Sequence, residues 1–167
     1  MELIGDTRVR MAPGMYSWCI LLTFTIPATA PADELIGNVL AHPRYGHDCI
    51  SPWTGVPDAV HGPYRLDSLK ADVFQRCSPA DAVASLWSWP ATNLNAWVST
   101  ELLLSRELVM AWTSPILTSA DEIYRLTLPR EGNEHDYGWV VGLSGFHEFL
   151  AVCRERGVAT VIIASDD

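Results

Sequence analysis

Lysine is almost missing from this chain of 167 residues: Lys70 is the only lysine beside ten arginines. The 11 basic residues stand against 20 acidic ones, so the formal net charge is −9, and neither arginine nor lysine forms a run. A nucleic-acid-binding surface needs clustered positive charge to neutralise phosphates, so we expect no nucleic-acid partner. A negative chain attracts positively charged surfaces, which permits a basic protein partner without identifying one.

Charged residues are also scarce, at 19% of the chain, whereas 49% of the residues are apolar. Disordered chains combine low hydrophobicity with high net charge, so this composition predicts a packed core. No uncharged apolar stretch reaches the roughly 18 residues of a membrane-spanning helix, so we expect no membrane span. We expect residues 1–15 to form a flexible N-terminal arm, with Pro13 and Gly14 as breakers, and residues 16–167 to form a single domain.

Apolar periodicity and helix-start signals predict an α+β fold with a mainly antiparallel sheet and two to four helices. Ser78 followed by Pro79 is a typical helix start, and Pro31 opens a second helix with acidic residues in its first turn. Residues 96–113 fit either one helix or two strands, and the β-rich residues at 109–113 favour strands slightly. Strands are expected at residues 17–26, 64–74, 122–128, 137–143 and 158–164.

The C-terminal third predicts a strand–helix–strand unit. Its helix would begin at Ser144 and end near Gly157, which is placed as the residue after a helix C-terminus. The apolar stripe of that helix recurs at the spacing i, i+3, i+4 and i+7. Its members are Phe146, Phe149, Leu150 and Cys153.

The apolar stretch over residues 16–26 has two interpretations. It follows Arg8 and Arg10 and precedes small residues at Ala30 and Ala32, which is the outline of a secretory signal peptide cleaved near those alanines. Threonines alternate with larger apolar residues in the same stretch, which is typical of a core strand. We favour the core strand and a cytoplasmic protein, with secretion as the alternative.

Residues 42–61 carry the densest group of reactive side chains, and they are the basis of an alternative enzymatic function. Histidine and cysteine are common zinc ligands, but the spacing matches no Cys-x-x-Cys or helical His-x-x-x-His motif. No cofactor is therefore predicted, and a zinc site is kept only as an alternative. Its ligands would be His42, His47, Cys49 and His61.

The same stretch offers a nucleophile for a small hydrolase or transferase. The thiol of Cys49 would attack, His47 would act as its base, and Asp48 or Asp58 would orient that base. In a strand, His47 and Cys49 would lie on one face because they are two residues apart. The sequence leaves open whether the protein is an enzyme.

Seven tryptophans are a large number for a chain of this length. Tryptophan is usually part of a core, but it is also enriched at the centres of protein–protein interfaces. Residues two apart on a helix point to different sides, so Trp87 and Trp89 are not both expected in one buried stripe. With Trp53, which lies in the long loop, they are the candidate binding residues. The resulting hypothesis is a small, acidic protein-binding or inhibitory module of the immunity or antagonist type, which covers a surface of another protein.

Overall fold

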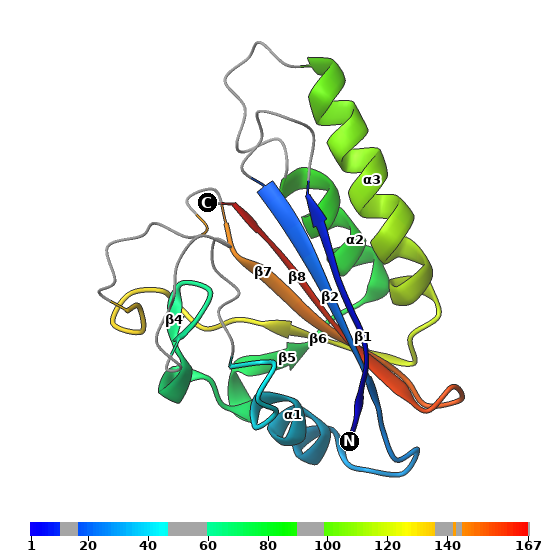
Figure 1. Cartoon of the computed structure of the whole chain (residues 1–167), viewed down its shortest axis with the longest axis vertical. Helices are drawn as coiled ribbons and strands as arrows, with labels where there is room; N and C mark the ends of the chain where they lie inside the picture. Colours follow the sequence, from blue (N-terminus) through cyan, green and yellow to red (C-terminus); the bar gives the residue numbers. More distant parts are fainter. Residues whose placement is uncertain (11–16, 47–59, 90–98, 136–141, 143–144, 167) are drawn as a thin grey trace.

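The described part of the chain forms a six-stranded antiparallel sheet with helices on both faces (Figure 1). This computed structural model describes residues 1–10, 17–46, 60–89, 99–135, 142 and 145–166. The strand order is β1-β2-β8-β7-β6-β5, so the predicted α+β class with a mainly antiparallel sheet is confirmed. The sheet strands are β1 (Leu3–Arg10), β2 (Ser17–Thr25), β5 (Phe74–Arg76), β6 (Glu122–Leu126), β7 (His147–Cys153) and β8 (Val158–Asp166); β3 (Val60–His61) and β4 (Tyr64–Arg65) form a separate hairpin.

Three helices of the described chain cover the sheet, and their sides are set by the alternation of side chains along the strands. From β2, Leu22 belongs to the core beneath α1 (Ala32–Leu40), whereas Leu21 belongs to the core beneath α2 (Pro79–Ser88) and α3 (Ser99–Thr118). Both faces of the central strands are therefore buried. No helix of the described residues is long and apolar enough to cross a membrane.

Several helices and strands begin where the sequence predicts. Ser78 is the N-cap of α2, and its hydroxyl oxygen accepts a hydrogen bond from the Asp81 backbone N–H at 3.1 Å. The stretch interpreted as a core strand forms β2, between β1 and β8 in the sheet. Strands β6 and β8 and helix α1 also lie where they are expected. Of the strand expected at residues 137–143, only Gly142 lies within the described residues.

The predicted helix after Ser144 is wrong, because His147–Cys153 form strand β7, which pairs with β8 as an antiparallel hairpin. Phe149 packs toward α2 and α3, whereas Leu150 packs toward α1. The sequence of a strand that is buried on both faces is a continuous apolar run. A short run of this kind also contains apolar residues at the spacing of a buried helix stripe. Gly157 lies in the β7–β8 turn with a φ of 61°.

Three further expectations are corrected. Of the segment 96–113, left open between one helix and two strands, the described residues belong to helix α3 (Ser99–Thr118). Val109 and Thr113 lie one turn apart on its buried side, where packing outweighs their β propensity. Leu3–Arg10, within the segment expected to be a flexible arm, form the edge strand β1. The expected strand at residues 64–74 is instead β4 and the start of β5, with two short 3₁₀ turns between them.

Candidate functional site

A tyrosine, a histidine and a glutamate meet in the core on the α1 side of the sheet. The Tyr45 hydroxyl donates to Glu148 Oε1 at 2.8 Å, and His61 Nε2 lies 2.8 Å from Glu148 Oε2. His61 Nδ1 lies 2.8 Å from the Tyr45 carbonyl oxygen, and the two rings stack with their centroids 3.9 Å apart. All three residues are at most 1% exposed. We call this arrangement the clasp, because it fastens Tyr45 and His61 to each other and to β7.

His61 ends strand β3, and the turn that follows it packs closely against the ring of Phe146. Only a glycine at position 62 permits this contact. Gly62 has a φ of 54°, and a Cβ atom on this residue would lie 2.1 Å from the ring of Phe146. The ring of Phe146 therefore packs over the turn, edge-on to His61 at 5.7 Å and to Tyr64 at 5.8 Å between centroids. These aromatic rings cover the clasp and exclude water from its hydrogen bonds.

The clasp differs from a catalytic carboxylate–histidine pair in one respect. A catalytic imidazole keeps one nitrogen for the reacting group while the carboxylate orients the other. In the clasp, His61 Nδ1 is bound to the Tyr45 carbonyl oxygen and Nε2 is bound to Glu148, and the ring is fully buried. The arrangement is therefore suited to joining chain segments, not to exchanging protons with a ligand.

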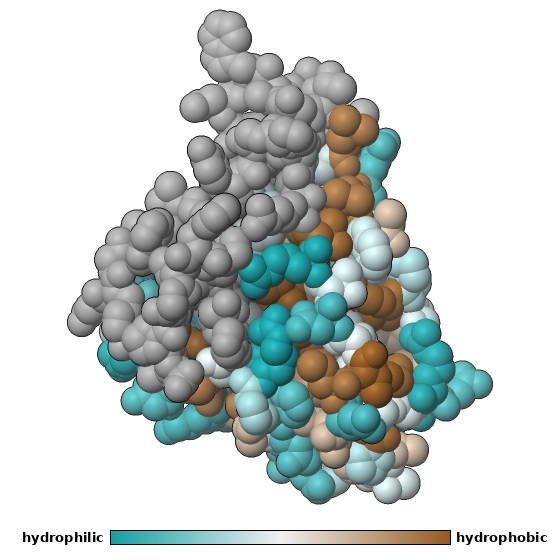
Figure 2. Space-filling view, in the orientation of Figure 1, coloured by the Kyte–Doolittle hydropathy of each residue, from teal (hydrophilic) through white to brown (hydrophobic). Residues whose placement is uncertain are grey.

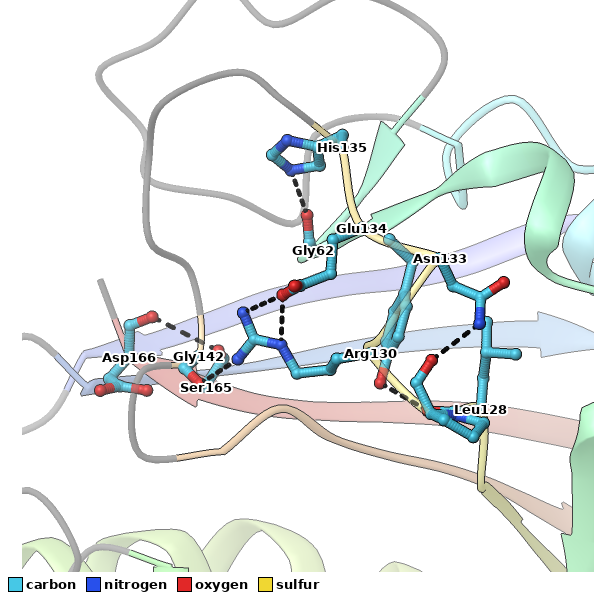
Figure 3. Close-up of polar contacts among 11 residues, drawn as sticks. Gly62, Leu128, Arg130, Asn133, Glu134, His135, Gly142, Ser165 and Asp166 are labelled. Carbon is cyan, nitrogen blue, oxygen red and sulfur yellow. Dashed lines mark hydrogen bonds and ion pairs between the residues drawn. The ribbon is translucent and has the colours of Figure 1, made fainter.

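A second polar group lies near the ends of the strands and is drawn in Figure 3. Arg130 pairs with Glu134 at 2.6 Å and donates to the Gly142 carbonyl oxygen at 2.6 Å, while the Gly142 N–H donates to the Asp166 carbonyl oxygen at 2.8 Å. His135 Nε2 lies 3.0 Å from the Gly62 carbonyl oxygen. These contacts connect the loop after β6 to the end of β8 and to the β3–β4 hairpin.

His147 precedes Glu148 in β7, so its side chain faces the opposite side of the sheet. Its ring lies edge-on to Trp89 with the centroids 6.4 Å apart. Burial, and then the positive charge of Arg125, lowers the pKa of His147 to about 4. His147 is therefore neutral at pH 7.

Helix α3 carries large apolar side chains on its solvent side. Leu104 is 54% exposed and Trp112 is 44% exposed. The half-buried Leu108 lies between them at a spacing of four residues, and it also packs against the core beneath α2 and α3. The buried side of the same helix includes the hydroxyl-bearing Ser105 and Thr113. Exposed leucine and tryptophan beside buried serine and threonine reverse the usual distribution. We call Leu104, Leu108 and Trp112 the α3 stripe. Figure 2 shows hydrophobic and hydrophilic side chains mixed along the side of the molecule where α3 lies.

The two adjacent candidate tryptophans have different environments. Trp87 in α2 is 42% exposed, and the guanidinium of Arg106 lies 5.2 Å from its ring centroid. Arg106 Nε also donates to the Trp87 carbonyl oxygen at 2.9 Å. Trp89 is buried in the core beneath α2 and α3, so it cannot present its side chain to a partner. The third candidate, Trp53, lies outside the described residues.

The predicted catalytic and metal-binding residues are only partly within the described chain. His47, Asp48 and Cys49 lie outside it, so their roles remain predictions. His42 Nδ1 accepts a hydrogen bond from the Arg44 backbone N–H at 3.1 Å, and His61 belongs to the clasp. Within the described ranges, no group of three histidine, cysteine or acidic side chains could hold a metal ion.

Sequence reasoning missed Tyr45 and Glu148, which complete the clasp, and the interface candidates Leu104, Leu108 and Trp112. The sequence does contain one indication that Glu148 has buried hydrogen-bond partners. It is the only acidic residue in residues 145–153, and a carboxylate within an apolar run needs hydrogen-bond partners when the run is buried. The sequence contains no comparable signal for the partners themselves, because Tyr45 and His61 are distant from Glu148 along the chain.

Comparison of the chain with protein-family models, with curated proteins and with solved structures finds no match.

Proposed function

We propose that this protein is a small acidic protein-binding module of the inhibitor or immunity type, and that the α3 stripe covers a surface of its partner. The observation that carries the proposal is the exposure of Leu104 and Trp112 on the outer side of α3. Leaving such side chains in water gives up the free energy of burying them, about 1.5–3 kcal/mol for a side chain of leucine size. Because Leu104 is 54% exposed and Trp112 is 44% exposed, a partner surface that covers both would recover about half of this free energy for each side chain.

The partner that fits this stripe is a protein with an apolar patch and an excess of positive charge. The chain carries a net charge of −9, and the exposed Glu107 borders the stripe. Opposite charge steers two proteins together and raises their association rate. Two copies of this chain would instead repel each other, so a basic partner is favoured over a homodimer.

Trp112 is the residue that we expect to contribute most to binding. Tryptophan is enriched among the few interface residues whose removal costs more than about 2 kcal/mol. Trp87 is a secondary contact in this proposal, because Arg106 already occupies a position near its ring.

We also propose the cytoplasm as the compartment of this protein. Cys19, Cys77 and Cys153 are free thiols. Free thiols persist in reducing compartments, whereas oxidising ones favour disulfides.

Site-specific photo-crosslinking in the native host tests the proposed surface. A photoreactive amino acid is placed at position 104, at position 112 or at the control position 4, where Ile4 is equally exposed but lies on β1. We expect positions 104 and 112 to capture the same basic protein, in competition with excess unlabelled wild-type chain, and position 4 not to capture it. Equal capture from all three positions, or capture of a second copy of this chain, would contradict the proposal.

A further inference from the structure

The hydrogen bonds of the clasp determine where its protons lie. A carbonyl oxygen can only accept a hydrogen bond, so His61 Nδ1, at 2.8 Å from the Tyr45 carbonyl oxygen, carries a hydrogen. The 2.8 Å contact between His61 Nε2 and Glu148 Oε2 needs a second hydrogen between its two atoms. Ring and carboxylate together therefore hold one proton more than a neutral imidazole and an ionised carboxylate would.

Two contacts of Tyr45 decide which group carries that proton. Its hydroxyl donates to Glu148 Oε1, so the carboxylate receives one donor on each oxygen, which favours its ionised form. Its ring stacks on His61 at 3.9 Å between centroids, and the face of an aromatic ring attracts a cation. Both contacts favour an imidazolium on His61 and a carboxylate on Glu148.

We infer that the clasp is a buried imidazolium–carboxylate pair, and that its proton makes the attachment of Tyr45 and His61 to β7 dependent on pH. If the proton is lost, the lone pair of His61 Nε2 faces the charged Glu148 Oε2 at hydrogen-bond distance. That contact is repulsive, and burial prevents water from replacing the lost hydrogen bond. The clasp therefore opens when the proton leaves.

Among the residues that the structure describes, the titratable and charged groups near the clasp are themselves engaged. Tyr64 donates to the Leu128 carbonyl oxygen at 3.0 Å, and burial raises the pKa of Tyr64, so it remains uncharged. Arg130 and Glu134 form an ion pair, so their charges largely offset each other near the clasp.

Further charged or titratable groups of the described residues lie on the surrounding segments. Arg44, beside Tyr45 in the chain, pairs with Asp6 of β1 at 2.7 Å. His135 contacts the Gly62 carbonyl oxygen. His147 faces the other side of the sheet and is neutral at pH 7, so the clasp gains no charge from β7 beyond that of Glu148.

The pH range of this effect follows from counting protons. An unfolded chain loses the histidine proton above about pH 6.5 and protonates the glutamate below about pH 4.3. Between these values both states hold one proton on the pair, so the contribution of the clasp to stability is constant. Above about pH 6.5 the folded chain holds one proton more than the unfolded chain, so the unfolding constant rises by up to tenfold per pH unit until the clasp opens.

Nuclear magnetic resonance of the full chain with ¹⁵N-labelled histidine tests the protonation state directly. The ring of His61 is assigned through its contacts with the ring of Tyr45. At about pH 8, where free histidine is neutral, we expect both ring nitrogens of His61 to be protonated. A ring with only one protonated nitrogen at this pH would overturn the inference.

The variant Glu148→Gln is the matched test, because its amide can replace every hydrogen bond without charge. The amide oxygen can accept from the Tyr45 hydroxyl, and the amide NH₂ can donate to Nε2 of a neutral His61. We expect His61 in this variant to keep only the Nδ1 hydrogen at about pH 8. If the ring keeps both hydrogens, Glu148 is not the group that holds the proton, and the inference fails.

Unfolding by urea gives a second readout that a merely structural role would not change. Between about pH 7 and 9, we expect the unfolding constant of the wild type, divided by that of Glu148→Gln, to rise by up to tenfold per pH unit. The control Tyr64→Phe removes a neighbouring hydroxyl and leaves the pair intact, so it should keep the pH dependence of the wild type. A ratio that does not change with pH would refute the proton-dependent clasp.

Discussion

His147 and Glu148 are adjacent in β7 and face opposite sides of the sheet, where their surroundings favour opposite proton states. On the α2–α3 side, burial and the charge of Arg125 keep the His147 ring neutral. On the α1 side, Glu148 holds His61 through a bond that needs a hydrogen. Neighbouring residues of one strand thus enter different environments: the ring of His147 stays neutral, whereas Glu148 is hydrogen-bonded to a second histidine.

The lowered pKa of His147 predicts a loss of stability in acid. The unfolded histidine titrates near 6.5 and the folded one near 4, so the contribution is complete above pH 6.5 and is lost as pH falls toward 4. The loss is about 3 kcal/mol at most. The variant His147→Gln should lose less free energy of unfolding than the wild type between pH 7 and 4.5, measured by urea titration. Equal losses in the two proteins would contradict this explanation.

The two neighbouring tryptophans provide a matched comparison of burial. Trp89→Ala should lower the free energy of unfolding by about 3–5 kcal/mol, because it leaves a cavity in the core beneath α2 and α3. Trp87→Ala should cost less than about 1 kcal/mol, because it removes an exposed ring and one cation–π contact. Urea unfolding measures both values. Similar costs for the two variants would show that the assignment of their environments is wrong.

At the level of helices and strands, the sequence predicts those elements that are marked by residues at their own ends. Ser78 caps α2, and the prolines and acidic residues near residue 31 mark the start of α1. These signals act within a few residues, so no knowledge of the rest of the fold is needed to interpret them. The core strand β2 was also predictable, because its threonines alternate with large apolar residues.

The elements that were not predictable depend on distant parts of the chain. The apolar run of strand β7 predicts a helix, because burial on both faces removes the alternation of apolar and polar residues that identifies a strand. Helix α3 was assigned to strands on the propensity of Val109 and its neighbours, and packing overrides a weak propensity. The clasp could not be predicted from the sequence either, because it depends on a contact between Glu148 and His61, which are 87 residues apart along the chain.

The N-cap of α2 gives a test of a local signal. Ser78→Ala removes the acceptor for the Asp81 N–H and should lower the free energy of unfolding by about 1 kcal/mol. Ser88→Ala is the control at the other end of the helix, where the hydroxyl donates to a carbonyl oxygen one turn earlier, and should change stability by less than about 0.5 kcal/mol. Circular dichroism during urea unfolding measures both. An equal effect of the two substitutions would argue against the cap.

For the whole molecule, His147 and the proton-dependent clasp each predict a loss of stability away from about pH 6.5, where an unfolded histidine titrates. Stability falls below this pH as His147 resists protonation, and it falls above this pH as the clasp retains a proton that the unfolded chain releases. His147→Gln should flatten only the acid side of the profile, and Glu148→Gln only the alkaline side. The free energy of unfolding measured from pH 4.5 to 9 in the three proteins checks this. If both variants follow the wild-type profile, these residues do not set it.

Charge and shape together lead to the proposed partner. The net charge of −9 favours a basic surface, and Leu104 and Trp112 of the α3 stripe leave apolar surface exposed on the described fold. Neither the charge nor the stripe depends on the clasp, which lies on the opposite side of the sheet. Binding and pH-dependent stability can therefore be tested separately.

The most direct test of the binding proposal is isothermal titration calorimetry with the basic protein that positions 104 and 112 capture. We expect Trp112→Ala to raise the dissociation constant about 30-fold, which corresponds to a loss of about 2 kcal/mol of binding free energy. Ile4→Ala, which removes an equally exposed apolar side chain on β1, should leave the constant unchanged within about twofold. An unchanged constant for both Trp112→Ala and Leu104→Ala would contradict the proposal that the α3 stripe is the binding surface.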